Sequence, residues 1–218
     1  MNKTTTLKLT VMALMAALCY VAFTFLQIKI PTPVGFTSFH LGNTFCVLAA
    51  LLLGGVPGGI AGAVGMGIGD LLDPVYITVA PKTIILKTGI GIVTGLFAHK
   101  VFHIQDKEGS ELYKDVVLSC TAGMIFNLIG ETLLSYLYYL VILGSAEKAA
   151  TYLAAAKFVT TGVNGVLAIV IASALYIAMY PRLKSNGTLK KLAPKNWTVW
   201  KIMQFFFMCI ENSWVVFL

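Results

Sequence analysis

The sequence predicts an all-α membrane protein in which about six transmembrane helices form one bundle. Of its 218 residues, 58% are hydrophobic and only 11% are charged, and the mean hydropathy is +0.84. A soluble domain carries roughly a quarter charged residues, so a soluble fold is excluded. The apolar runs are long, they are separated by short polar loops, and basic residues gather in alternate loops.

The apolar runs divide into six expected spans, of which the second and third are short and share a turn at residues 54–59. They lie near Leu7–Ile28, Leu41–Val56, Pro57–Leu72, Thr83–Val101, Val116–Leu143 and Leu153–Met179. No soluble domain is left over, so we expect one transmembrane domain at residues 1–181 and a basic cytoplasmic tail at residues 182–218. The tail ends in an apolar stretch from Asn196, which is interpreted as a membrane-surface helix, with a seventh span or an unnatural end of the reading frame as alternatives.

Basic residues precede the first span, separate the fourth from the fifth, and follow the sixth. With six spans all of these positions fall on one side, which the positive-inside tendency assigns to the cytoplasm, together with both termini. The net charge of +7 is therefore a topology signal, and we expect no nucleic-acid partner. These residues are Lys3, Lys8, Lys100, Lys107, Lys114, Arg182, Lys184, Lys190, Lys191 and Lys195.

The third span, within GGVPGGIAGAVGMGIGDLLDP, is rich in glycine and alanine. Small residues four positions apart share a helix face and allow helices to approach closely in lipid, so this span is expected to pack tightly against its neighbours. The pairs are Gly55/Gly59, Gly58/Gly62, Ala61/Gly65 and Gly65/Gly69. The chain has no G-x-x-x-x-G-K-[ST] motif, so we expect no ATP hydrolysis by this chain itself.

Ionisable and amide side chains gather in the outer halves of several spans. Such groups are costly inside a membrane and usually line a cavity or pair with one another, so this pattern predicts a pocket for a small polar molecule. Asn127, Glu131 and Ser135 share one face of the fifth span, and we expect it to face Lys157 and its neighbours on the sixth. The alternative is that Lys87, Glu131 and Lys157 only form buried salt bridges. The whole set is His40, Asn43, Asp70, Asp73, Tyr76, Lys82, Lys87, Asn127, Glu131, Tyr138, Lys157, Thr160, Thr161 and Asn164.

Two longer stretches carry a resemblance to a known family. The run IPTPVGFTSFHLGNTFCVLAALLLGGVPGGIAGAVGMGIGDLLDP and the later APKTIILKTGIGIVTGLFAHK resemble the substrate-binding S components of energy-coupling factor (ECF) transporters. The resemblance covers Thr5 to Pro181 and is strongest to the branch for riboflavin, pyridoxine and hydroxymethylpyrimidine. It implies a six-helix subunit of the bacterial cell membrane that captures a vitamin or precursor and is not an enzyme.

The resemblance also implies partners and site residues. An S component works with a membrane T subunit and two ATPase subunits, and it needs no cofactor or metal of its own. Its first helix docks on the T subunit through two alanines four apart, here Ala13 and Ala17, which the spacing alone would assign to ordinary packing. The substrate contacts are expected at Asn43, Asp70, Tyr76, Lys87, Glu131, Lys157 and Asn164.

Two other functions fit the residues themselves. The first is a stand-alone secondary transporter in which Glu131 or Asp70 carries a coupling proton. The second is an intramembrane enzyme acting on lipid through Asp70, Asp73 and His40. They differ in what they predict: uptake driven by a proton gradient in the first case, and turnover by the isolated chain in the second.

Overall fold

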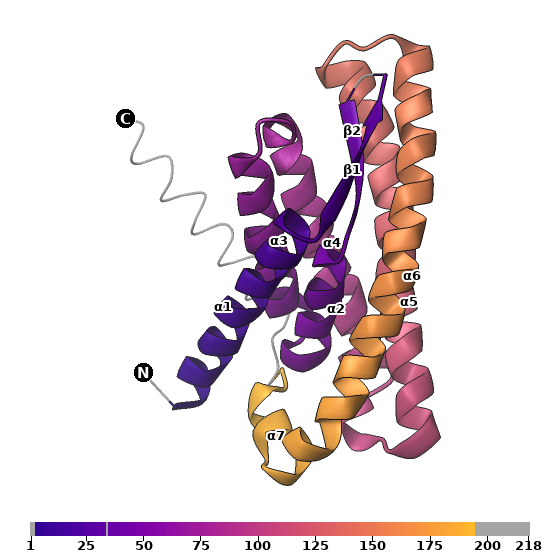
Figure 1. The fold of residues 1–218 in the computed structure, drawn as a ribbon. Coiled ribbons are helices and arrows are strands. Elements are labelled where there is room, and N and C mark those ends of the chain that lie inside the picture. The colour runs from indigo at the N-terminus through magenta and orange to yellow at the C-terminus, as the bar shows by residue number, and fades with distance from the viewer. Residues whose placement is uncertain (1–2, 34, 195–218) are drawn as a thin grey trace.

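The computed structural model describes residues 3–33 and 35–194, which form a helical bundle with a β-hairpin at one end (Figure 1). The π-turn η2 (Phe97–Val101) extends α4, the π-turn η4 (Tyr138–Ile142) extends α5, and the short 3₁₀ turns η1 (Ile77–Val79) and η3 (Ile104–Asp106) lie in loops. The apolar stretch from Asn196, with its expected surface helix, lies outside the described residues. The main elements are α1 (Lys3–Thr24), β1 (Gln27–Thr32), β2 (Gly35–His40), α2 (Gly42–Leu53), α3 (Gly55–Leu72), α4 (Ala80–Leu96), α5 (Gly109–Leu137), α6 (Glu147–Ser185) and α7 (Thr188–Leu192).

Within the described residues, five helices are long and apolar enough to cross a membrane: α1, α3, α4, α5 and α6. The expected second span differs, because α2 has only 12 residues. At 1.5 Å per residue it is about 18 Å long, well short of the ~30 Å hydrocarbon core. Its end is set by Gly54, whose φ of 94° favours glycine and turns the chain directly into α3.

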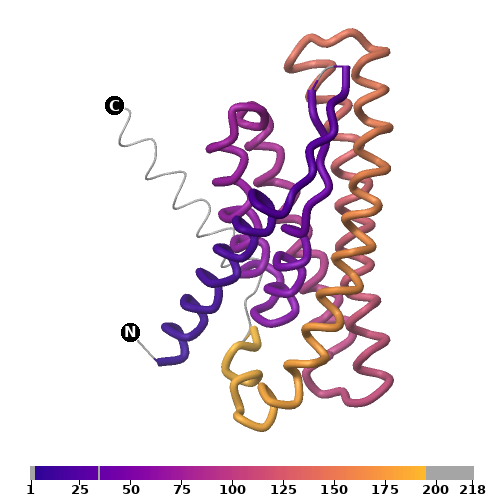
Figure 2. Tube along the Cα trace, in the orientation of Figure 1, coloured from indigo at the N-terminus to yellow at the C-terminus, as the bar shows by residue number. Residues whose placement is uncertain are grey.

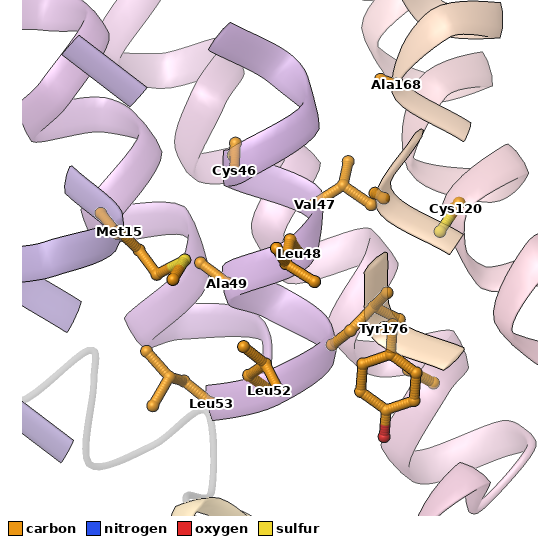
Figure 3. Close-up of a cluster of buried hydrophobic side chains, with 14 of the residues drawn as sticks. Met15, Cys46, Val47, Leu48, Ala49, Leu52, Leu53, Cys120, Ala168 and Tyr176 are labelled. Carbon is orange, nitrogen blue, oxygen red and sulfur yellow. The ribbon is translucent and has the colours of Figure 1, made fainter. Parts of the chain in front are cut away.

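The short helix α2 is the centre of the hydrophobic core, where it contacts α1, α3, α4 and α6. Four consecutive residues of α2, which point to different sides, are all buried, as expected for a helix that is apolar all round: Val47, Leu48, Ala49 and Ala50. Figure 3 shows Met15 of α1 on one side of this helix, and Ala168 and Tyr176 of α6 on the other. The helix α2 is therefore shielded by protein on all sides and supports the polar residues at its first turn.

The small residues of α3 contact three different helices, which confirms the expected close packing. Gly59 lies against the backbone of α4 at Gly91, and Gly58 lies against Ala50 of α2. Gly65 lies against Ala16 and Cys19 of α1. A side chain at any of these glycines would overlap its neighbour, so each pair of small residues brings a different helix close to α3.

The β-hairpin was not expected, since the first span was expected to run to Ile28. Instead α1 ends at Thr24, and β1 pairs antiparallel with β2 so that Gln27 lies opposite His40 and Thr32 opposite Gly35. The hairpin lies alongside the upper parts of α5 and α6 in Figures 1 and 2. We call this end of the bundle the hairpin end.

At the opposite end, α6 continues past Pro181 to Ser185 and the chain turns back into α7. Gly187 makes this turn with a φ of 63°. Leu189 and Leu192 of α7 are buried in the core, and Lys8 Nζ on α1 donates a hydrogen bond of 2.7 Å to the carbonyl of Ala193. The first part of the expected tail is thus packed against the bundle.

Candidate functional site

A polar cavity lies inside the hairpin end of the bundle, with a free volume of about 50 Å³. Six helices and strand β2 contribute to its wall, because the second halves of α1, α3 and α5 and the first halves of α2, α4 and α6 meet there. The lining residues are Phe23, Thr37, Ser38, His40, Asn43, Asp70, Tyr76, Val79, Lys82, Thr83, Lys87, Asn127, Glu131, Lys157, Thr160, Thr161 and Asn164.

All seven residues expected to contact a substrate line this one cavity. Each is buried or nearly so, although six of them come from five different helices and Tyr76 comes from the loop after α3. The structure therefore brings together the whole predicted set, which is Asn43, Asp70, Tyr76, Lys87, Glu131, Lys157 and Asn164.

Glu131 on α5 is the centre of an ion network across three helices. Its Oε1 accepts a hydrogen bond of 2.5 Å from Lys82 Nζ on α4 and one of 3.2 Å from Lys157 Nζ on α6. Lys82 also donates to Ser135 Oγ at 2.9 Å. The prediction that the polar faces of α5 and α6 face each other is confirmed. The residues that form these ion pairs also line the cavity.

Lys87 on α4 is held differently from the other two lysines. Its Nζ donates a hydrogen bond of 3.3 Å to Asn127 Oδ1 on α5. None of the ion pairs among the described residues includes Lys87, although its side chain is buried. The ammonium can donate three hydrogen bonds, so it has donors left to offer.

Asn164 on α6 attaches the hairpin to the bundle. Its Nδ2 donates to the carbonyl of Ser38 at 3.0 Å, and its Oδ1 accepts from the backbone N–H of His40 at 3.1 Å. One turn earlier on α6, the hydroxyl of Thr160 lies 2.6 Å from that of Thr37 on β2. Because both ends of the Asn164 amide are occupied by β2, this side chain acts by positioning the hairpin over the cavity.

Four polar atoms of the cavity wall are buried without a hydrogen-bond partner in the described part of the chain. They are two acceptors, Asn43 Oδ1 and Asp70 Oδ2, one donor, Asn127 Nδ2, and the hydroxyl of Tyr76. Buried polar atoms are nearly always hydrogen-bonded in folded proteins. Four such atoms around one cavity indicate a surface made to bind a polar molecule.

Some lining residues were not among the expected contacts. Phe23 of α1 and Val79 gave no signal in the sequence, because an apolar residue in an apolar run is indistinguishable from core. Phe23 packs edge-on against His40, with ring centroids 4.8 Å apart. Thr37 and Ser38 are adjacent on β2, between Phe36 and Phe39, so GFTSFH lacks the strict alternation that marks a strand with one polar face.

The residues of the enzyme alternative do not form one cluster. Asp70 and His40 line the cavity, but Asp73 does not. Asp73 instead accepts a hydrogen bond of 2.5 Å from Lys29 on β1, which is a second attachment of the hairpin. Among residues 3–33 and 35–194, no group of three His, Cys, Asp or Glu side chains could hold a metal ion.

Ala13 and Ala17, the expected docking residues, lie far from this cavity. Both are exposed on the side of α1 that faces away from the other helices, whereas Met15 and Cys19 on the opposite side are buried. The small face is thus accessible from outside the bundle, as a docking surface requires.

Comparisons with known proteins agree with this architecture. Residues 3–181 match the family model of the "ECF-type riboflavin transporter, S component". The solved structure of ThiT from Listeria monocytogenes has a TM-score of 0.58 with this chain at 17% identity, covering 88% of this chain and all of that one, so the two share a fold. An "Uncharacterized protein in gap 3'region" of Pyrococcus woesei is 27% identical over 119 residues, which are 55% of this chain and 73% of that protein.

The family match covers nearly all of the described bundle, from the start of α1 to Pro181 in α6. S components are substrate-binding subunits of transporters and not enzymes, so the alternative of a lipid-modifying enzyme is wrong. The chain belongs to the S components of the ECF-type riboflavin transporter family, and it is a multi-pass plasma-membrane protein that binds a vitamin-type substrate for transport.

Proposed function

We propose that this subunit captures a small vitamin or vitamin precursor in the cavity at the hairpin end and releases it into the cytoplasm when coupled to a T subunit and two ATPase subunits. The observation that carries the proposal is the buried cavity lined by polar groups from five helices and strand β2, in which four polar atoms have no hydrogen-bond partner in the described residues. In this proposal the hairpin end faces outward, and the α7 end, where the basic residues gather, faces the cytoplasm.

The unpartnered atoms describe the kind of molecule that fits. A ligand that donates hydrogen bonds to Asn43 Oδ1 and Asp70 Oδ2 and accepts one from Asn127 Nδ2 would satisfy them. A heterocycle with hydroxyl or amine substituents carries both donors and acceptors of this kind. Pyridoxine, hydroxymethylpyrimidine and riboflavin all belong to this chemical class.

The size of the cavity favours the smaller members of that class. Pockets for drug-sized ligands measure about 300–1,000 Å³, far above the cavity's 50 Å³. The rings in the wall are Phe23, His40 and Tyr76, which suit one flat ring better than three fused ones. A single-ring ligand therefore needs less rearrangement of the wall than riboflavin does.

Entry of any such ligand requires the wall to open. The hairpin closes the cavity at its outer end and is attached through Asn164 and Thr160 on α6 and through the Lys29–Asp73 ion pair. These polar contacts can exchange with water at the membrane surface, and Phe36 of β2 adds an apolar contact with the cluster around Tyr139. We propose that movement of the hairpin admits the ligand.

The test is a thermal-shift screen of the full chain in detergent against riboflavin, pyridoxine, hydroxymethylpyrimidine and other water-soluble vitamins and precursors. A ligand that binds only the folded state raises the melting temperature with its concentration. We expect at least one compound to do so, without being chemically changed. Absence of any shift would overturn the proposal.

Coupling is tested separately, by uptake into vesicles that contain this chain with or without the T and ATPase subunits. We expect uptake to require those subunits and ATP. Uptake that persists without the ATPases and stops when the proton gradient collapses would instead support the stand-alone transporter, with Glu131 or Asp70 as its proton carrier.

A further inference from the structure

The charged groups in the cavity wall do not balance. Three lysines line it, Lys82, Lys87 and Lys157, against two carboxylates, Asp70 and Glu131. All five side chains are buried or nearly so, and Glu131 is shared between Lys82 and Lys157. The wall therefore carries one ammonium more than it has carboxylates.

A net charge in a buried site is costly, because neither water nor a paired ion compensates it. Lys82 and Lys157 share the carboxylate of Glu131, whereas Lys87 has a neutral amide as its hydrogen-bond partner. Neither Lys87 nor Asp70 takes part in an ion pair of the described residues. A substrate with one negative charge at Lys87 would give this lysine a counter-ion and remove the imbalance of the wall.

The neighbour of Lys87 gives this charge a defined binding geometry. Asn127 accepts from Lys87 through Oδ1, which leaves its Nδ2 as a buried donor without a partner. An ammonium with free donors and an amide N–H therefore lie side by side at the cavity wall. A carboxylate has two oxygens that can accept from both groups at once.

We propose that the substrate of this subunit is a monoanion whose carboxylate binds between Lys87 Nζ and Asn127 Nδ2, and that Lys87 and Asn127 select acids over their neutral analogues. The inference rests on the proposed function, and within the vitamins and precursors it favours an acid over the neutral pyridoxine, hydroxymethylpyrimidine and riboflavin named there. Asn43 and Asp70, which also line the cavity, would then receive hydrogen bonds from the donor groups of the same molecule.

The test uses pairs of compounds that differ in the acid group. The full chain in detergent is titrated with nicotinate and nicotinamide, 4-pyridoxate and pyridoxine, and pantothenate and panthenol, and binding is measured by thermal shift and calorimetry. We expect the acid of at least one pair to bind at least tenfold more tightly than its neutral partner. Tighter or equal binding of a neutral compound, riboflavin and hydroxymethylpyrimidine included, would overturn this inference and leave the proposed function intact. No binding by acids or neutral compounds would overturn both.

Two variants assign the preference to the proposed residues. Lys87→Met removes the ammonium at similar length, and Asn127→Asp provides Lys87 with a carboxylate inside the protein. Both should abolish the preference for the acid, while the melting temperature of the ligand-free chain stays the same or rises, because each variant removes the charge imbalance. Lys148→Met, at an exposed lysine near the start of α6, should leave the preference unchanged. A preference for acids that survives in both cavity variants would place the carboxylate elsewhere and overturn the assignment.

Discussion

Lys82 on α4 lies 2.5 Å from the carboxylate of Glu131 on α5, and the same oxygen atom accepts a second hydrogen bond from Lys157 on α6. One carboxylate thus connects three helices inside the apolar bundle. The cavity wall is therefore also part of what stabilises the fold, and functional and structural roles overlap in this residue.

Glu131→Gln is expected to destabilise the protein strongly, because it leaves the ammonium groups of Lys82 and Lys157 buried without their counter-charge. Loss of one partner of a buried ion pair costs about 3–5 kcal/mol. The measurement is the melting temperature of the ligand-free chain in detergent. Glu111→Gln on the exposed first turn of α5 is the matched control and should change stability by less than about 0.5 kcal/mol. Equal melting temperatures for the two variants would show that the ion network contributes nothing to stability.

How far the sequence predicts this site depends on the kind of pattern involved. The polar faces of α5 and α6 could be predicted because Asn127 and Glu131, like Lys157 and Asn164, recur with the period of a helix. The lysines that pair with Glu131 could not be predicted, because the pairing depends on the rotation and tilt of three helices. The salt-bridge alternative drawn from the sequence named Lys87 and Lys157, whereas the structure pairs Glu131 with Lys82 and Lys157.

The β-hairpin was missed for a different physical reason. Ile28 and Ile30 continue the apolar run of α1, so the run alone suggests a longer helix. The strand conformation depends on pairing with residues 35–40 and on the contacts of Asn164, which are distant in the sequence. The second span was expected to be short, but its place in the core was missed, since the length of an apolar run does not show whether lipid or protein surrounds it.

Asn164→Ala is expected to loosen the hairpin without unfolding the bundle. It removes two hydrogen bonds to β2, worth together about 1–3 kcal/mol. Hydrogen exchange of the backbone N–H of His40 should become faster, and a bound ligand should dissociate faster. Asn186→Ala, at the exposed end of α6, is the control and should change neither rate. Unchanged exchange at His40 in Asn164→Ala would show that other contacts hold the hairpin in place.

Gly91→Ala is expected to separate α3 from α4. A Cβ atom at Gly91 would overlap the backbone of Gly59, so the helices must move apart, at about 1–3 kcal/mol. Gly162→Ala on α6 makes the same chemical change where the nearest atom of a neighbouring segment, Leu128 Cδ1, is 4.0 Å away. That control should be neutral or stabilise the helix by up to about 1 kcal/mol. Similar melting temperatures for the two variants would contradict the close contact of α3 and α4.

Ala13→Trp and Ala17→Trp are expected to block docking on the T subunit while leaving substrate binding intact. Both alanines are exposed on the outer face of α1, so an indole there would enlarge the docking surface without disturbing the bundle. The cavity is lined by Phe23 on α1 and not by either alanine. Co-purification with the T and ATPase subunits measures docking, and ligand titration of the isolated chain measures binding.

The control for these variants must place the same bulk at the same end of the molecule. Ala174→Trp is suited to this, because Ala174 is an exposed alanine in the second half of α6, toward the α7 end, and Ala178 follows it four residues later as Ala17 follows Ala13. If docking uses α1, Ala174→Trp keeps the complex and Ala13→Trp loses it. Loss of the complex in both would mean that added bulk on either helix is enough, whereas lost ligand binding in Ala13→Trp would mean that α1 couples its outer face to the cavity. Only a selective loss at α1, with unchanged ligand affinity, separates the docking surface from the substrate site.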